Sequence, residues 1–336
     1  MAWLSFLMDA CWRSAGRTKR SGYGIFPESG LNVKVSLIQR LDRRVLCRIV
    51  ELDLARVELR LVIDWELVRQ SFLTPPIKSI GRNLPDYLAI QPQGQSSSIG
   101  RLLFASNTLH TNFVRGNGFV IANGDVVCKP AGAVALDGSQ FQPLNGDYTV
   151  LVLSPGRPAV MQVGLENNRL TSPDIPRLAI SGPRLVQDGA NVACRISTRL
   201  PSEGQTAGDE VNFLPERRRS SFTAFGAQAD GTLLAISCFA GEICEDYPQP
   251  GYTGFLATAE DGLTLSEVAD LMIDWGVVEA IAGGGSGDTQ HYVRGQGAWL
   301  ALTAAHTGRP GLQSQDGLPV VRGLGAILLA YETVSG

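Results

Sequence analysis

The sequence predicts an α+β fold of mixed, mostly antiparallel β-sheets with few helices. Three early segments, 32–38, 45–50 and 57–63, place apolar residues at every second position for much of their length, as half-buried strands do. Further along, Asn-Gly and Asp-Gly dipeptides recur beside apolar runs, and these supply the positive φ that tight hairpins require. Only the segment 264–276 shows a strong helical period.

The N-terminal segment is expected to form an arm over residues 1–25, disordered or packed, ahead of a single domain over 26–336. Its first twelve residues are apolar, but Asp9 interrupts them and the basic residues follow instead of preceding them, so they do not fit an export signal. No run reaches the 18 or so apolar residues of a membrane span. We therefore expect a cytoplasmic protein with no membrane contact.

The amino-acid composition also excludes some classes of function. The 336 residues are 44% hydrophobic and 18% charged with a net charge of −3, so no global basic field exists to hold nucleic acid. Six cysteines lie without a CxxC pair or Cys/His ligand spacing, and we expect reduced, structural thiols and no metal or other cofactor. They are Cys11, Cys47, Cys128, Cys194, Cys238 and Cys244.

Turn dipeptides divide the middle of the chain into hairpins. Segment 221–239 shows this best, because apolar runs stand on both sides of one such turn. The middle of the protein is therefore predicted to be mainly antiparallel β. The dipeptides are Asn123-Gly124, Asp137-Gly138, Asn145-Gly146, Asp188-Gly189 and Asp230-Gly231.

The predicted helix is marked at both ends. Thr264 and Glu267 have the spacing of a capping box, in which each side chain bonds the other's backbone N–H. Gly276 suits the left-handed residue that ends a helix. Between them an apolar stripe faces the core, with Trp275 expected to be largely buried; its members are Val268, Leu271, Met272 and Trp275.

A glycine run follows the helix and a short predicted strand, 277–281. Gly283, Gly284 and Gly285 with Ser286 remove every Cβ from a strand end, so a ligand can meet backbone N–H groups there. A flexible Gly/Ser linker is the alternative. We favour a structured loop, because an apolar strand leads into the run and an apolar stretch, 291–293, follows it. The last strand is expected over 324–331.

Five segments, in this order, resemble the phosphodiester glycosidase family. They are 118–127, 181–189, 222–231, the capped helix with its glycine run, and 319–325. The resemblance spans most of the chain from about Val45 onward. It implies an α+β fold rich in mixed sheet and the hydrolysis of a sugar phosphodiester.

The chain departs from the family pattern at polar positions. The family's Asn-Gly-Gly-Phe-Phe stands here as Asn-Thr-Leu-His-Thr over 107–111. Ala282 occupies the place of an Asp before the glycine run, and Phe222 and Leu318 replace arginines. Glycosyl transfer needs carboxylates, and cations hold phosphate. The resemblance therefore implies the loss of one carboxylate and two cations.

The candidate site residues fall into two groups. Asp288 and His110 are catalytic candidates only if the protein is an enzyme; a turn-capping Asp and a structural His are the simpler interpretations. The other candidates bind a ligand, with the two arginines as anion sites, although exposed arginine is the ordinary case. They are Asn107, Ser181, Arg219, Thr223, Gly283, Gly284, Gly285, Ser286 and Arg322.

The sequence favours a binding or accessory protein over an enzyme. Its ligand is expected to be a small molecule or a peptide, with a partner protein as a further candidate and a biosynthetic pathway as a candidate setting. The alternative is a diverged glycosidase that hydrolyses a sugar phosphodiester or a related glycosidic bond.

Overall fold

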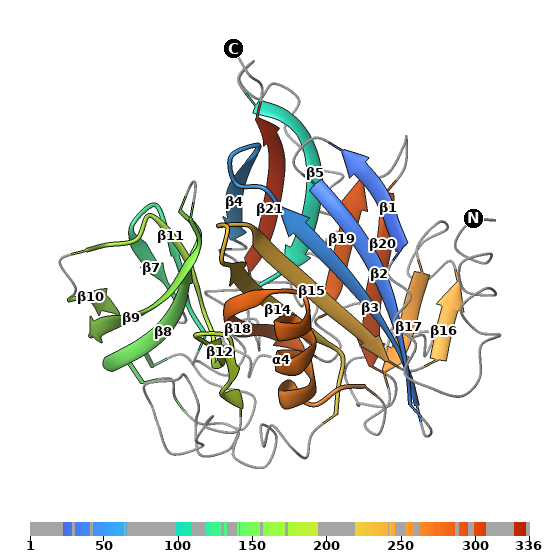
Figure 1. Cartoon of the computed structure of the whole chain (residues 1–336). Coiled ribbons are helices and arrows are strands. Elements are labelled where there is room, and N and C mark those ends of the chain that lie inside the picture. The colour runs from blue at the N-terminus through green and yellow to red at the C-terminus, as the bar shows by residue number, and fades with distance from the viewer. Residues whose placement is uncertain are drawn as a thin grey trace.

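A computed structural model describes these residues: 23–28, 31–40, 43–63, 65, 99–108, 118–128, 131–132, 140, 142–154, 157–171, 174–193, 219–240, 242–245, 253–257, 262–285, 289–294, 299–306 and 326–333. They form three β-sheets and one helix (Figure 1). The expected dominance of antiparallel sheet is confirmed. The helical part of the α+β assignment is small, because one helix is found in the described part of the chain.

Sheet A is an eight-stranded antiparallel sheet. Its strands lie in the order β1 (Tyr23–Glu28), β2 (Leu31–Arg40), β3 (Arg43–Leu52), β15 (Leu233–Ala240), β14 (Phe222–Gln228), β18 (Val277–Gly285), β12 (Arg184–Gln187) and β13 (Ala190–Asn191). Strand β1 begins inside the segment predicted as an arm, and residues 1–22 lie outside the described part.

Sheets B and C complete the fold. Sheet B has seven strands in the order β16 (Glu242–Glu245), β17 (Thr253–Ala257), β20 (Trp299–His306), β19 (Gln290–Arg294), β5 (Ile99–Asn107), β21 (Ala326–Thr333) and β4 (Val57–Ile63), with β17 and β20 parallel. Sheet C has six strands in the order β10 (Arg169–Leu170), β9 (Ala159–Glu166), β8 (Gly146–Val152), β11 (Leu178–Ser181), β6 (Val120–Ala122) and β7 (Asp125–Val127).

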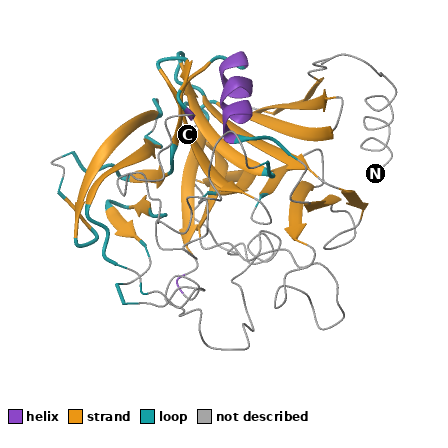
Figure 2. Ribbon diagram, turned by 90° about the horizontal axis from the view of Figure 1, so that it is seen from below, coloured by secondary structure: helices purple, strands orange, loops and turns teal. Residues whose placement is uncertain are grey.

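The two faces of sheet A bury different partners. On one face, Val50, Ala235 and Phe225 are cross-strand neighbours that join an apolar cluster with residues of sheets B and C. On the other face, Cys47 and Cys238 belong to a cluster under the helix α4 (Leu265–Asp274). Figures 1 and 2 show α4 on the outside of sheet A. Both thiols are free, and the Cys47 Sγ lies 2.9 Å from the Cys238 Sγ.

Helix α4 begins and ends where the sequence predicts. The Glu267 N–H donates to Thr264 Oγ1 and the Thr264 N–H donates to Glu267 Oε2, which is the capping box. Gly276 has φ +81° and closes the helix. Trp275 packs against the edge of this cluster and is intermediate in exposure, so it is less buried than Val268, Leu271 and Met272 of the same stripe. None of the helices that the structure describes is long and apolar enough to cross a membrane.

The predicted turns are confirmed in three places. Asn123-Gly124, Asp188-Gly189 and Asp230-Gly231 connect β6 to β7, β12 to β13 and β14 to β15. Asn145-Gly146 instead opens strand β8, and Asp137-Gly138 lies outside the described residues. The pair Asn167-Asn168, both at positive φ, forms an unpredicted turn between β9 and β10.

The glycine run is strand and not loop. Strand β18 continues through Gly285 and pairs there with Phe222 of β14. The prediction that the run is ordered is confirmed, whereas the prediction that the strand ends near Ile281 was wrong. Glycine lacks a side chain to reveal the β period, which is why the sequence pattern stops four residues early.

Candidate functional site

A row of polar side chains runs across three strands of sheet A, β3, β15 and β14, next to the apolar residues of the same face. Ser237 of β15 is the cross-strand neighbour of both Arg48 on β3 and Thr223 on β14. Successive side chains along a strand alternate between faces. The row therefore lies on the face of Val50 and Ala235, which is the face turned toward sheet B. All three polar side chains are buried.

Sheet B supplies the other half of this polar group. The Thr223 hydroxyl donates to Asn107 Oδ1 at 2.8 Å and lies 3.0 Å from the Ser237 hydroxyl. The Gln290 N–H donates to the same Asn107 oxygen at 3.0 Å. One Arg48 N–H donates to the His291 carbonyl at 3.1 Å. We call this group the inter-sheet polar cluster; it comprises Arg48, Asn107, Thr223, Ser237, Gln290 and His291, and we include the buried Thr289 because it directly precedes Gln290.

The glycine run brings the two sheets together at this cluster. A Cβ on Gly283 would lie 2.6 Å from the Thr108 carbonyl oxygen and 3.0 Å from the Phe225 ring. The Gly284 N–H donates to that same carbonyl at 3.1 Å. Absence of a side chain therefore lets the end of β5 approach β18, which places Asn107 within reach of Thr223. The close approach predicted for a ligand is made here by the protein's own backbone.

Three buried side chains of the cluster keep unsatisfied polar atoms. Asn107 Nδ2, Thr289 Oγ1 and both ring nitrogens of His291 have no hydrogen-bond partner among the described residues, and each of these residues is fully buried. A buried polar atom without a partner costs about 1–3 kcal/mol. Each such atom in a native protein needs an explanation, such as a bound water, an ion, a ligand or a catalytic role.

Burial also sets the charge of the cluster. It lowers the pKa of Arg48 to about 9, which still leaves the guanidinium mostly protonated at neutral pH. Burial, and then the nearby Arg48 charge, hold the pKa of His291 well below its ordinary value of 6.5. The imidazole is therefore neutral near pH 7, with one ring N–H to donate and one nitrogen to accept.

Carboxylates are absent from the buried polar side chains that the structure describes. The described residues also contain no group of three side chains able to hold a metal ion. The cluster thus offers hydroxyls, two side-chain amides, an imidazole and one cation.

The structure brings together some of the predicted site residues and not others. Asn107, Thr223 and the glycine run meet at the cluster. Ser181 ends strand β11 of sheet C, and its hydroxyl accepts from the Phe119 N–H at 2.9 Å. Arg219 stands next to Ser220, which pairs with Leu263 ahead of α4. Four candidates lie outside the described residues: His110, Ser286, Asp288 and Arg322.

Several cluster members were not predicted from the sequence. Arg48 interrupts the apolar run 45–50, and a charge inside such a run is a usable sign of a buried functional group. Ser237 and Thr289 carry no such sign, because hydroxyl residues are common on strands and in turns. His291 lies in a segment that the pattern indicated only as ordered.

Two of the three described departures from the family pattern lie away from the cluster, whereas the third, Thr108, accepts the Gly284 N–H beside it. Ala282 and Phe222 both belong to the apolar cluster under α4. The Phe222 ring would meet a Cβ on Gly285 at 2.7 Å, so the ring covers that end of the glycine run on the helix side. These two substitutions therefore do not line the inter-sheet polar cluster.

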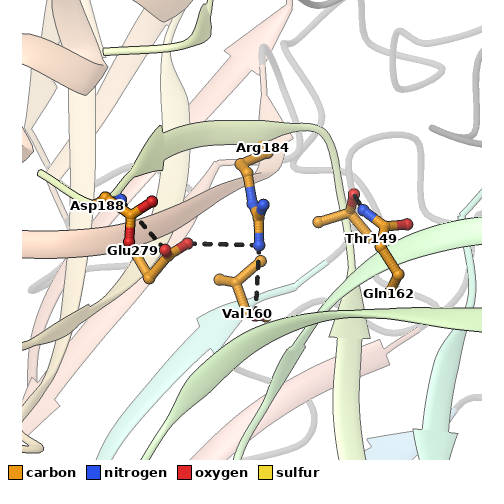
Figure 3. Close-up of polar contacts among 6 residues, drawn as sticks. All are labelled: Thr149, Val160, Gln162, Arg184, Asp188 and Glu279. Carbon is orange, nitrogen blue, oxygen red and sulfur yellow. Dashed lines mark hydrogen bonds and ion pairs between the residues drawn. The ribbon is translucent and has the colours of Figure 1, made fainter. Parts of the chain in front are cut away.

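A second polar group joins sheet A to sheet C (Figure 3). Arg184 of β12 lies 3.5 Å from Glu279 of β18 and donates to the Val160 carbonyl of β9 at 3.3 Å. Glu279 Oε1 also accepts from the Asp188 N–H at 3.2 Å. We call these four residues the Arg184 group.

Comparison with known proteins gives a family match and a fold match. The model of the phosphodiester glycosidase family matches residues 110–312, more than half of the chain. The zebrafish N-acetylglucosamine-1-phosphodiester α-N-acetylglucosaminidase catalytic domain, auto-inhibited by pro-peptide, superposes with a TM-score of 0.54 at 18% identity, over 95% of this chain and 90% of that chain. This likeness shows the fold.

Two further solved structures are more distant. A hypothetical protein from Synechocystis gives a TM-score of 0.43 at 12% identity, covering 94% of this chain and 64% of that one. A putative exported protein from Burkholderia pseudomallei gives 0.40 at 12% identity, covering 86% and 74%. No curated protein matches the sequence.

Proposed function

Because the chain belongs to the phosphodiester glycosidase family, we propose that it uses this fold to bind a small ligand at the inter-sheet polar cluster without hydrolysing it. The observation that carries the proposal is the set of open polar atoms on Asn107, Thr289 and His291, in a cluster whose described buried members include no carboxylate.

Hydrolysis of a glycosidic bond requires catalytic groups that the described residues of the cluster lack. Transfer of a glycosyl group normally uses two carboxylates, as acid, base or nucleophile. The His291 imidazole is a poor substitute, because a general base works best with a pKa near the working pH and burial holds the pKa of His291 well below its ordinary value. Arg48 provides a positive charge but no proton acceptor.

The ligand class follows from the open atoms. The Asn107 amide donates, the Thr289 hydroxyl donates or accepts, and the His291 ring does both. Hydroxyl and amide groups match this set, since each of them can give and take a hydrogen bond. Sugars with an N-acetyl group carry both, and so do peptides. N-Acetylglucosamine is the first ligand to test, because the zebrafish relative is named for that sugar.

Thr289→Val gives a sharp test by calorimetry and thermal melting with N-acetylglucosamine, N-acetylglucosamine 1-phosphate and N-acetyl amino-acid amides. The change removes a hydroxyl that has no hydrogen-bond partner among the described residues, so the free protein should become about 1 kcal/mol more stable. Binding of the ligand should weaken roughly fivefold, as expected for one lost hydrogen bond.

Thr223→Val is the matched control. It removes a hydroxyl with partners at 2.8 and 3.0 Å, so it should destabilise the free protein by about 1–2 kcal/mol. No binding by any ligand of the panel, or unchanged affinity in Thr289→Val, would contradict the proposal.

A diverged glycosidase remains the competing function, and one observation favours it. Asp288 directly precedes Thr289, whose side chain is fully buried beside the cluster. Assays on a panel of glycosyl phosphodiesters should detect no enzyme-like turnover. Robust turnover that disappears in an Asp288→Asn, His110→Gln double variant would establish the enzyme.

A further inference from the structure

A cavity of about 580 Å³ lies away from the inter-sheet polar cluster, between strand β4 and one end of sheet C. That volume is typical of a site for a small ligand or a short peptide. The residues that line it are Leu54, Val57, Glu58, Leu59, Arg60, Leu61, Ala122, Asn123, Leu153, Ser154, Arg177 and Leu178.

One wall of the cavity is the outer edge of a sheet. β4 is the last strand of sheet B, paired on one side with β21, and no described strand pairs with its other side. Five successive residues of β4, 57–61, line the cavity. Side chains of one face alone would give every second residue. The unbroken run means that the strand edge itself, with its outward N–H and C=O groups, faces the cavity.

The opposite wall has an apolar part in sheet C. Leu178 of β11 pairs with Ala122 of β6, and the Leu153 N–H donates to the Leu178 carbonyl at 2.9 Å. These three side chains therefore sit together at one end of sheet C. They face the half-buried Leu59 and Leu61, which pack on the main core. The β4 wall of the cavity is five residues long, and five residues of an extended strand span roughly 17 Å. A peptide segment of about that length could therefore lie along it.

The charges at the cavity leave one cation available. Arg60 is bound to Glu58, with nitrogen–oxygen distances of 2.7 and 2.8 Å, and its guanidinium lies over the Tyr331 ring at 5.6 Å. Arg177 is exposed, and its side chain makes no ion pair or hydrogen bond with the described residues; only its backbone carbonyl does, accepting from Gly124.

We propose that this cavity binds an extended peptide segment that adds to β4 as a new outer strand, with apolar residues at alternate positions and an acidic residue beside Arg177. A peptide backbone satisfies the outward N–H and C=O groups of β4, as in other cases of strand addition. An acyl chain or other apolar ligand would bury those groups without partners, at about 1–3 kcal/mol each. The proposal does not depend on the ligand of the inter-sheet polar cluster.

Fluorescence anisotropy with labelled, capped peptides tests the strand pairing. The probes are Val-Thr-Val-Glu-Val-Thr, the same peptide with Lys in place of Glu, and a version with N-methyl groups on alternate amides. We expect the Glu peptide to bind and the N-methyl version to lose at least tenfold in affinity, because several backbone hydrogen bonds are removed. Hydrogen exchange should slow at the β4 amides when the Glu peptide binds.

Two variants and one control test the walls. Ala122→Trp should fill the cavity and lower the affinity for the Glu peptide at least tenfold, with folding checked by thermal melting. Arg177→Glu, an exposed change that the fold should tolerate, should reverse the preference so that the Lys peptide binds about threefold better, as exposed ion pairs allow. Arg169→Glu alters an exposed arginine of β10 outside the cavity and should change nothing.

The proposal is overturned if no peptide of the panel binds. It is equally overturned if N-methylation leaves the affinity unchanged, because backbone pairing is then absent, or if binding persists in Ala122→Trp with no protection of β4.

Discussion

Two polar groups join sheet A to its neighbours, and they differ in how far their own residues satisfy them. The Arg184 group is partly exposed, with side-chain exposures of 20% for Arg184 and 22% for Glu279, and each charge has an opposite charge at 3.5 Å. The inter-sheet polar cluster is fully buried at Asn107, Thr289 and His291, and four polar atoms of these three have no hydrogen-bond partner in the described part of the chain. We treat the first as a structural contact, whereas the second is where we propose that a ligand binds.

Burial decides the difference. Arg184 Nε and Glu279 Oε2 are also buried without a hydrogen-bond partner among the described residues, but each belongs to a side chain that is about a fifth exposed and lies beside an opposite charge. Bulk water cannot reach the four atoms of the inter-sheet polar cluster to hydrogen-bond with them. Leaving them without partners therefore lowers the stability of the folded protein. A protein keeps such a cost where function requires it.

The largest expected effect comes from Gly283→Val, which separates the sheets at the cluster. The new Cβ would stand 2.6 Å from the Thr108 carbonyl oxygen, 3.0 Å from Phe225 and 3.1 Å from the Thr223 carbonyl oxygen. Two of these neighbours are backbone and cannot turn aside. We expect a loss of about 3 kcal/mol or more in the free energy of unfolding, as severe overpacking gives, measured by chemical denaturation.

Gly276→Ala is the control for this change. Its φ is +81° but only Gln228 Nε2 is near the new Cβ, at 3.7 Å, so the cost should be about 1 kcal/mol from backbone strain alone. Equal losses in the two variants would show that Gly283 is needed for conformation and not for the approach of β5.

The fold was largely readable from local pattern. Alternation located β2, β3 and β4, and turn residues with positive φ located three hairpins, because both signals arise within a few residues of chain. Trp275 shows the limit: its place on the helical stripe was right, but how much of the ring is covered depends on distant strands. The end of β18 was missed because glycines have no side chains to alternate.

The site was readable only in part. Asn107 and Thr223 were found through the family pattern, and the glycine run through its composition. Arg48, Ser237 and His291 join them only because three strand registers and the packing of two sheets bring residues 48, 237 and 291 together. No short segment indicates how distant strands pair. The sequence therefore predicts some of the site residues but not how they are arranged in space.

A smaller effect is expected from acid, through His291. The unfolded chain takes up a proton near the ordinary pKa of 6.5, while burial and the Arg48 charge lower the pKa in the folded protein. Below about pH 6.5 the unfolded state therefore binds the extra proton, and stability falls by up to about 1.4 kcal/mol per pH unit. Denaturation between pH 7 and about pH 5, above most carboxylate pKa values, should show this slope.

Two glutamine variants isolate the imidazole. His291→Gln should flatten the slope whatever it does to stability at pH 7, and His110→Gln should keep it. An unchanged slope in His291→Gln would mean that this imidazole is not buried and neutral, and the contrast with the partly exposed Arg184 group would be weaker.

The smallest effect is expected at the Arg184 group itself. Arg184→Met, Glu279→Gln and the double variant form a cycle whose coupling energy should be about 1 kcal/mol, because 3.5 Å is a long separation for an ion pair and both side chains still reach solvent over about a fifth of their surface. Ligand affinity at the inter-sheet polar cluster should stay within twofold in all three variants, since the group joins β12, β18 and β9 and touches none of the open atoms. A coupling well above 2 kcal/mol would show that the pair behaves as a buried one. A marked loss of affinity would show that the two polar groups act together, and the division between a structural contact and a binding site would then be wrong.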